Sequence, residues 1–522
     1  MDNQFEKYND IPKEEFALVG SDRVLHDQRF ETKPIGYFKD AFMRFARNKA
    51  SVVAAIIIGI LLIYAIVGPF CCNKTYTKAY TKDTSVINYQ KLKPRLSFLS
   101  GTGFWDGTKV EKKVSQKKYD EYRGMEQERG LKIITDVISS ETVTDDFGKV
   151  STYYTIRIDT YTSLKTMTAT LTSAEYKALQ EWQDENNVQV ILPRVKYNEG
   201  VVATQMPNIW YKIDRKMNAQ KDKDGNLVPS YYVEGTDDYT SKMRLASDPY
   251  NDGNVEGAYR YAQRTGKEGQ FNYVVRVDSY KYFQYKYGFE PSFVFGTDEK
   301  GYDIFSRLAS GARFSFILAI VVSVINLAIG AFYGAAMGYY GGSVDIILDR
   351  IAEILSGVPF MVVTVLFNLH LASKVGTIPA LFFAFILTGW IGMAYRVRMQ
   401  FYRFKNQEYV LAARTLGAKD FRIMFKHIFP NSLGTIITGS VLVIPGVIFS
   451  ETSLSYLGII NLDSATMSSV GSMLSTGQSC MTTDPHVVFF PALFIALLMI
   501  SFNLFGNGLR DAFNPSLRGV EE

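Results

Sequence analysis

The feature that most constrains this chain is a set of long apolar runs without charged side chains. The first run, residues 50–70, has about 20 residues, which as a helix is long enough to cross the hydrocarbon core of a bilayer. Further runs follow in the second half of the chain, at residues 314–340, 354–372, 378–395, 433–450 and 487–506. The expected fold is therefore an all-α polytopic membrane domain with six transmembrane helices, although hydrophobic residues make up only 47% of the sequence.

A long polar region separates the first two apolar runs. Residues 71–293 contain no run that could cross a membrane, so we expect a soluble domain inserted between the first two spans. Polar and apolar residues alternate at 153–161 and 187–195, a period typical of strands. Thr172 and Glu175 indicate the capped start of a helix. The expected domain is α+β and extracytoplasmic, and its sequence shows no catalytic constellation.

Basic residues orient the chain in the membrane. Residues 37–49 form a candidate amphipathic surface helix, and the basic residues just before the first span place the N-terminus in the cytoplasm. An ordinary solvated helix is an equally good interpretation of residues 37–49. Counting six spans, the loop 396–431 and the C-terminus also lie in the cytoplasm. This loop carries the basic residues Arg396, Arg398, Arg403, Lys405, Arg414, Lys419, Arg422 and Lys426.

The sequence thus divides into five parts. They are a cytoplasmic N-terminal segment (1–49), the first transmembrane helix (50–70), the extracytoplasmic domain (71–293), a membrane core with five more helices (294–506) and a cytoplasmic tail (507–522). Cys71, Cys72 and Cys480 form no CxxC motif or Cys/His cluster, so no metal site is expected. The net charge of +5 gives no reason to expect a nucleic-acid partner.

The loop between the fourth and fifth spans contains two short amphipathic helices. Gly417 separates them at a position where a helix C-terminus favours a positive φ. Asp420 is expected to cap the second helix, whose apolar stripe is Phe421, Met424, Phe425 and Ile428. Pro430 is expected to separate that helix from the next span. We call residues 408–430 the elbow; such an element with an exposed apolar face is suited to being gripped by another protein.

The elbow resembles the EAA motif by which permeases of ABC importers couple to their ATPases. The resemblance lies in Ala412, Ala413, Gly417 and Pro430 and in the form EYVLAARTLGA, which is similar to that of oligopeptide and dipeptide permeases. Leu411 departs from the glutamate of the motif. The resemblance implies an ATPase-coupling role for Glu408, Leu411, Ala412, Ala413, Gly417, Ala418, Phe421, Met424, Phe425 and Pro430.

A second segment, residues 295–313, resembles a signature of the same permeases before their second span. The matching positions include Gly296, Thr297, Asp298, Gly301, Asp303, Ser306 and Arg307, whereas Tyr302 departs from the usual arginine. Gly296 and Gly301 share the spacing of a phosphate-binding loop, but no lysine follows them, so this alternative fails. We expect an amphipathic surface helix that returns the chain to the bilayer.

Small and polar residues mark positions inside the spans. Gly330, Gly334 and Gly338 recur every four residues, which predicts a groove where a second helix packs closely. The polar residues Asn326, Asn368, His370 and Glu451 are candidates for lining a transport pathway. A buried hydrogen bond between helices is an equally good interpretation of each.

The resemblance implies a non-catalytic permease subunit of an ATP-driven importer in a bacterial or archaeal cell membrane. Its expected partners are a sister permease subunit, two ABC ATPase subunits, an extracytoplasmic substrate-binding protein and membrane lipid. It implies no cofactor bound by this chain, because ATP and Mg²⁺ are used by the ATPases; the chain itself has no Walker A sequence. Peptides are the expected cargo, with nickel chelates, opines and oligosaccharides as alternatives. A secondary transporter is a weaker alternative, since internal repeats and mid-membrane charges are not evident.

Overall fold

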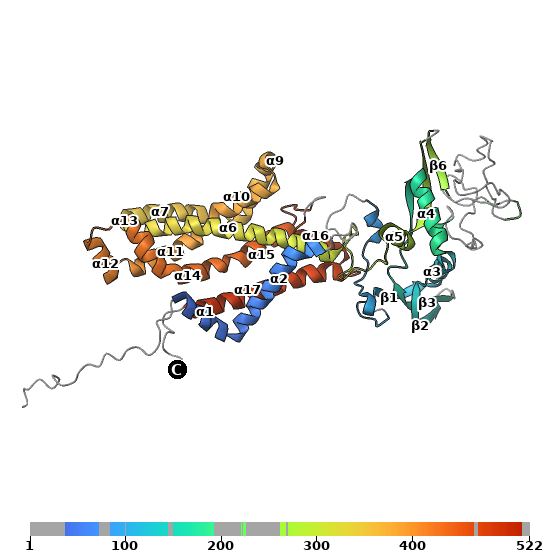
Figure 1. Ribbon diagram of the computed structural model, residues 1–522, viewed down its shortest axis with the longest axis horizontal. Coiled ribbons are helices and arrows are strands. Elements are labelled where there is room, and N and C mark those ends of the chain that lie inside the picture. The colour runs from blue at the N-terminus through green and yellow to red at the C-terminus, as the bar shows by residue number, and fades with distance from the viewer. Residues whose placement is uncertain are drawn as a thin grey trace, which may run out of the picture.

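A computed structural model describes residues 37–71, 84–99, 101–144, 150–192, 221, 223–225, 262–267, 270–463 and 468–513. It has two parts, a bundle of long helices and an α+β region at one end of the bundle (Figure 1). The elbow lies at the other end (Figure 1). The described part of the chain has five helical stretches long and apolar enough to cross a membrane, or up to six if one bent pair is counted as a span.

The helices of the bundle follow the apolar runs closely. They are α1 (Tyr37–Arg47), α2 (Lys49–Cys71), α6 (Ile304–Tyr340), α7 (Gly342–Ser356), α8 (Phe360–His370), α9 (Ala372–Val375), α10 (Thr377–Gly389), α11 (Ile391–Phe404), α12 (Glu408–Thr415), α13 (Asp420–Arg422), the π-helix η5 (Ile423–Ile428), α14 (Phe429–Val441), α15 (Val443–Tyr456), α16 (Val470–Gly477) and α17 (His486–Phe513).

The third predicted span is not one straight helix. Residues 354–372 fall on the end of α7, the whole of α8 and the start of α9, and α7 and α8 meet at an angle of 71°. The break lies at Gly357–Pro359. Proline disfavours the α conformation in the residue before it and has no N–H for a helical hydrogen bond, so the helix ends before Pro359 and restarts at Phe360.

The glycine groove on α6 packs against α11, as its spacing predicts. A Cβ on Gly334 would lie 2.2 Å from the Ala394 carbonyl oxygen, and one on Gly338 would lie 2.5 Å from the Phe401 Cβ. A Cβ on Gly330 would lie 2.8 Å from the Trp390 carbonyl oxygen. No side chain fits at these distances, so the three glycines set how closely the two helices approach. This packing places the end of α11, from which the elbow continues, against the end of α6.

Both ends of the described chain lie at the elbow end of the bundle (Figure 1). The predicted surface helix forms as α1, which packs against the last turns of α17. The rings of Phe45 and Phe505 are 5.2 Å apart in an edge-to-face arrangement. Gly508 leaves room for Ser51, since a Cβ there would lie 1.8 Å from the Ser51 hydroxyl. The α+β region lies at the opposite end.

The α+β region contains two antiparallel sheets. The first has the order β1 (Thr108–Ser115), β3 (Val150–Asp159), β2 (Ile134–Thr144) and carries α3 (Gln116–Arg129). The second pairs β7 (Gln270–Asp278) with β4 (Thr166–Thr172), β5 (Ile191–Leu192) and β6 (Ala262–Lys267), with α4 (Ser173–Asn186) packed on it. The short helices η3 (Thr84–Tyr89), η4 (Ser97–Leu99) and α5 (Ser279–Tyr287) complete the region.

Two of the three local predictions in this region are confirmed, and the third is confirmed in part. The strand predicted at 153–161 is β3, and Thr172 and Glu175 exchange hydrogen bonds at the start of α4. Of the strand predicted at 187–195, only Ile191–Leu192 forms one, and residues 193–195 lie outside the described residues.

The signature segment 295–303 is a tight loop and not the surface helix that its sequence suggested. Gly296 and Gly301 have φ of +77° and +83°, which favours glycine. Each also lies against the backbone of the α+β region, because a Cβ would come within 2.2 Å of the Leu92 carbonyl oxygen or 1.8 Å of the Val86 carbonyl oxygen. The Thr297 hydroxyl accepts a hydrogen bond from the Leu92 N–H at 2.9 Å. The segment therefore joins the α+β region to the bundle.

The same segment begins α6. Asp303 is the N-cap and accepts hydrogen bonds from the N–H groups of Phe305 and Ser306 and from the Ser306 hydroxyl. The α6 helix then continues without a break into the second span. Burial raises the pKa of Asp303 to about 6, because the carboxylate has little water around it.

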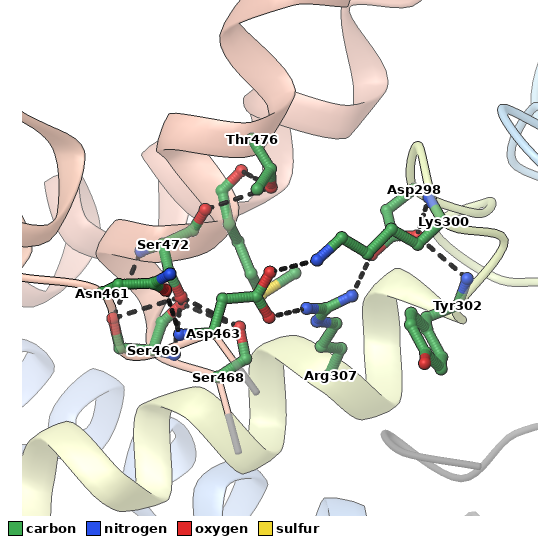
Figure 2. Close-up of polar contacts among 11 residues, drawn as sticks. Asp298, Lys300, Tyr302, Arg307, Asn461, Asp463, Ser468, Ser469, Ser472 and Thr476 are labelled. Atoms are coloured by element: carbon green, nitrogen blue, oxygen red, sulfur yellow. Dashed lines mark hydrogen bonds and ion pairs between the residues drawn. The ribbon is translucent and has the colours of Figure 1, made fainter. Parts of the chain in front are cut away.

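A buried ion-pair cluster holds this loop to the last part of the bundle. Arg307 donates to the Asp298 carboxylate at 2.6 Å and also pairs with Asp463. Figure 2 shows Lys300 and Arg307 on the same side of Asp463, one at each carboxylate oxygen, with the serines that cap α16 beside it. Burial raises the pKa of Asp298, an effect that the Arg307 guanidinium opposes. Removing Arg307 would leave the buried Asp298 carboxylate without an ion-pair partner among the described residues, so this cluster is a structural anchor.

Candidate coupling elbow and membrane groove

The first half of the elbow ends in a Schellman turn. Gly417 has φ of +79°, as its place in the sequence predicts, and its N–H donates to the Arg414 carbonyl at 2.9 Å. The Ala418 N–H donates to the Ala413 carbonyl at 3.1 Å. These are the two hydrogen bonds that define this helix ending, and Ala413 and Ala418 occupy the positions whose side chains commonly meet across it. The spacing of Ala413, Gly417 and Ala418 in the elbow is therefore the spacing of a fixed turn.

The second half of the elbow begins differently from the prediction. Lys419, not Asp420, is the residue before the first helical turn, and Asp420 lies within α13. The Asp420 carboxylate accepts a hydrogen bond from the Tyr339 hydroxyl at 2.7 Å. Arg414, from the first half of the elbow, donates to the same hydroxyl at 3.4 Å. Tyr339 at the end of α6 thus contacts both halves of the elbow.

The predicted apolar stripe is divided between the interior and the surface. Met424 is only 8% exposed and Ile428 is fully buried, both in a cluster with Tyr339, Val410 and Phe401. The prediction that Met424 belongs to an exposed face is wrong, because this side of the helix faces α11 and α6. Met424 therefore attaches the elbow to the bundle.

The exposed apolar surface of the elbow comes from other positions. Leu416 is 88% exposed, Phe421 is 66% exposed and Leu411 is 46% exposed. The Phe421 ring lies 4.7 Å from that of Phe425, which is half-buried. We call Leu411, Leu416 and Phe421, exposed apolar residues on the two sides of the Schellman turn, the elbow surface.

Pro430 does not separate the elbow from the next span. The chain runs from Asp420 to Tyr456 as one apolar helical stretch, and Pro430 lies in the first turn of α14. The preceding turn, Ile423–Ile428, is a π-helix. Proline has no N–H and crowds the preceding turn, and a π-turn is a recognised way to accommodate this without ending a helix. The second half of the elbow is thus continuous with the fifth predicted span, so a displacement of the elbow acts directly on that span.

A cavity of about 310 Å³ lies on the bundle between α6, α8, α10 and α15. We call it the middle cavity; its lining residues are Asn326, Phe360, Phe385, Thr388, Gly389, Val443, Gly446, Val447 and Ser450. Asn326 is 3% exposed and donates to the Phe385 carbonyl at 3.4 Å. Its Oδ1 atom has no hydrogen-bond partner among the described residues. An apolar cavity with a few convergent polar groups is the usual form of a binding site.

The other candidate pathway residues do not line the middle cavity. The Asn368 amide donates to the Ile459 carbonyl at 2.9 Å, and His370 is exposed at the end of α8. Glu451 is fully buried and accepts from the hydroxyls of Ser315 at 2.8 Å and Ser455 at 3.1 Å. Asn368 and Glu451 thus fit the alternative interpretation, a hydrogen bond that joins elements within the bundle.

A second cavity, of about 360 Å³, lies nearer the elbow. We call it the arginine cavity; its lining residues are Arg396, Arg403, Thr435, Thr438, Gly439, Arg510 and Phe513. Sequence reasoning treated Arg396 and Arg403 only as indicators of membrane side. Their spacing of seven residues, which places both on one helix face, is the signal that could have identified them.

Comparisons with known proteins give the same family for two separate parts of the chain. Residues 327–519 match the family model described as binding-protein-dependent transport system inner membrane component. Residues 36–94 match the N-terminal TM domain of oligopeptide transport permease C.

Individual relatives agree with these family models. The oligopeptide transport system permease protein OppC of Bacillus subtilis is 46% identical over 224 residues, 43% of this chain and 72% of the relative. The dipeptide transport system permease protein DppC of the same organism is 43% identical over 225 residues, 43% of this chain and 69% of the relative. Among solved structures, an inward-facing MetNI methionine ABC transporter matches with 15% identity and a TM-score of 0.33, over 40% of this chain and 96% of the other.

Proposed function

Since the chain belongs to the family of oligopeptide and dipeptide transport permeases of ABC importers, we propose that it forms one half of a peptide pathway, completed by a sister permease subunit. The chain is a multi-pass membrane protein of a non-catalytic kind. ATP and Mg²⁺ are used by two partner ATPases, and this chain binds no cofactor of its own. An extracytoplasmic binding protein delivers the cargo.

The observation that carries the proposal is the elbow. Its Schellman turn fixes two helices at a set angle, and the elbow surface of Leu411, Leu416 and Phe421 projects from the end of the bundle. A rigid apolar projection of this kind can fill a groove on an ATPase. Because Tyr339 and the π-turn connect the elbow to α6 and α14, closure of the ATPases would shift those helices between two arrangements.

The proposed orientation follows from the elbow. If the ATPases contact the elbow, that end of the bundle is cytoplasmic, and α1 and the end of α17 lie there too (Figure 1). The α+β region is then extracytoplasmic. With the bent pair α7 and α8 counted as one span, the chain crosses a bacterial or archaeal cell membrane six times, with both termini in the cytoplasm.

The pathway follows the middle cavity. Its polar residues Asn326, Thr388 and Ser450 are surrounded by apolar side chains and two glycines, a lining that suits an uncharged peptide backbone. The sister permease would close the cavity from the other side. Peptides are the proposed cargo because the similar relatives are oligopeptide and dipeptide permeases; nickel chelates, opines and oligosaccharides remain the alternatives.

The α+β region serves as a docking platform for the binding protein or as a lid over the pathway mouth, and is an insertion relative to shorter relatives. Its attachment to Gly296 and Gly301 holds it at the outer end of α6. A test replaces Thr108–Asp278 with a Gly/Ser linker and keeps the segment that contacts the signature loop. Unchanged uptake together with unchanged affinity for the binding protein would exclude both roles.

The proposed function as a whole is tested by purification of the tagged chain from native membranes, with mass spectrometry of the proteins that accompany it. We expect two ATPase chains, a second permease and, under gentle conditions, a binding protein. A chain that purifies folded but alone would favour the ATP-independent transporter.

A further inference from the structure

Three arginines at the elbow end of the bundle surround a single cavity. Arg396 and Arg403 come from α11, two turns apart on one face, and Arg510 comes from the last turn of α17. The hydroxyl-bearing residues Thr435 and Thr438 of α14 line the same cavity. Within the described part of the chain, none of the three guanidinium groups forms an ion pair with a carboxylate.

The position of Arg396 is fixed where α11 packs against α14. The Arg396 guanidinium donates to the Gly439 carbonyl at 2.9 Å and lies across that glycine. A Cβ on Gly439 would come within 2.5 Å of the guanidinium nitrogen, so glycine is what gives Arg396 its place. One N–H therefore holds the guanidinium at the lining of the cavity, and its planar fork suits an acceptor with two oxygens.

The arginine cavity and the middle cavity lie on the same helix faces. On α14 and α15, Gly439, Val443, Gly446 and Ser450 follow one another at intervals of three or four residues, a single helical stripe. On α10 and α11, Gly389, Arg396 and Arg403 follow at intervals of seven. The two cavities therefore lie along the same faces of these helices, and we call this shared face the groove; it has neutral polar groups in the middle and three positive charges at the elbow end.

This shared face favours one of the possible anions. Basic pockets between transmembrane helices also bind lipid phosphates, but this pocket shares its helix faces with a cavity of convergent polar groups, which favours a ligand that moves along those faces. Every linear peptide with an unmodified end carries one terminal carboxylate, whatever its side chains. A site for that group suits a permease that accepts many sequences.

We propose that Arg396, Arg403 and Arg510 form an anion site at the cytoplasmic mouth of the groove, which binds the terminal carboxylate of a peptide as it leaves the middle cavity. The inference rests on the proposed function, because it assumes that peptide cargo follows this groove. Bidentate contact with Arg396 or Arg403 holds the carboxylate, and the Thr435 hydroxyl donates an additional hydrogen bond.

The first experiment measures binding without the substrate-binding protein. The purified transport complex is heated with and without millimolar tri-alanine or tri-alanine amide, which differ only at the terminal carboxylate. We expect tri-alanine to raise the thermal midpoint and the amide to have a smaller effect, since a ligand that binds the folded state stabilises it. In the double variant Arg396→Gln/Arg403→Gln, the two peptides should have equal effects. Absence of an acid-specific shift in the wild-type complex would overturn the inference.

The second experiment measures ATP-driven uptake of the same two peptides into vesicles that contain the complex. We expect the acid-to-amide uptake ratio to fall about ten-fold in the double variant, the typical loss when charge-assisted hydrogen bonds are removed. Arg350→Gln is the matched control, because Arg350 is exposed on α7 and pairs with Glu353 away from the groove. The Arg396→Lys variant keeps the charge but loses the bidentate fork, so its ratio should lie between those of the wild type and the double variant.

The outcomes separate this inference from the proposed function. A wild-type complex that imports no peptide at all contradicts peptide transport itself. Peptide import with the same acid-to-amide ratio in wild type and double variant contradicts only the anion site. A thermal shift produced by phosphatidylglycerol, lost in the double variant and accompanied by no response to tri-alanine, would assign the arginines to lipid and overturn the proposal.

Discussion

Replacing Gly334 by alanine should separate α6 from α11 and destabilise the bundle. The added Cβ would lie 2.2 Å from the Ala394 carbonyl oxygen and 2.9 Å from the Val397 Cβ. Carbon and oxygen atoms in close contact sit about 3.3 Å apart, so α11 must retreat by about 1 Å. The nearest obstacle is backbone, which cannot rotate away as a flexible side chain could.

The size of this effect follows from known overpacking costs. Forcing an extra carbon into a close-packed interface costs about 1–3 kcal/mol, more than the ~0.5–1 kcal/mol that alanine gains over glycine in a helix. The middles of these two ranges differ by about 1 kcal/mol, so the thermal midpoint of the purified protein should fall by about 2 °C. Because Tyr339 at the end of α6 hydrogen-bonds to the elbow residue Asp420, transport should fall as well.

The matched control is Gly59→Ala in α2, where an added Cβ would meet nothing within 4 Å. This variant should unfold at the wild-type temperature or slightly above it. The reasoning is refuted if Gly334→Ala and Gly59→Ala unfold at the same temperature.

Two further predictions concern the elbow surface and the start of α6. Phe421→Asp should reduce the amount of ATPase that co-purifies with the folded chain at least ten-fold, because the ring is 66% exposed on the elbow surface. The control is Phe98→Asp, since Phe98 is 80% exposed in the α+β region, and this variant should co-purify with the wild-type amount of ATPase. Equal amounts of ATPase with both variants would contradict the role of the elbow surface. For Asp303, the folded pKa of about 6 lies above the unfolded value of about 3.9, so the folded state holds the proton more tightly and stability falls as pH rises from about 4 to 6. Asp303→Asn should remove that part of the pH dependence of thermal unfolding, because asparagine can still cap the helix but does not titrate. An unchanged pH profile in this variant would contradict the raised pKa of Asp303.

Features set by neighbouring residues were predictable from sequence. The positive φ of Gly417 follows from the helix that ends before it, and the groove on α6 follows from glycines spaced every four residues. The capping pair of Thr172 and Glu175 is equally local. In each case the sequence window that carries the signal also contains the structural cause.

Features set by distant contacts were not predictable in this way. Met424 is buried because of where α11 and α6 lie, and nothing in the elbow sequence distinguishes its exposure from that of Phe421. The partner of Arg307, Asp463, is 156 residues away. The arginine cavity is lined by Arg396 and Arg403 of α11 and by Arg510 of α17. Helix periodicity places the first two on one face of α11, but it does not predict that Arg510 joins them.

The most direct test of the central claim, that the elbow couples ATP hydrolysis to transport, is the number of peptides imported per ATP hydrolysed by Gly417→Pro. Proline cannot adopt φ of +79° and has no N–H for the Arg414 carbonyl, so the Schellman turn is lost while α6 and α11 remain packed. We predict normal membrane insertion and almost no import per ATP. A wild-type ratio in this variant would show that the elbow is not the coupling element.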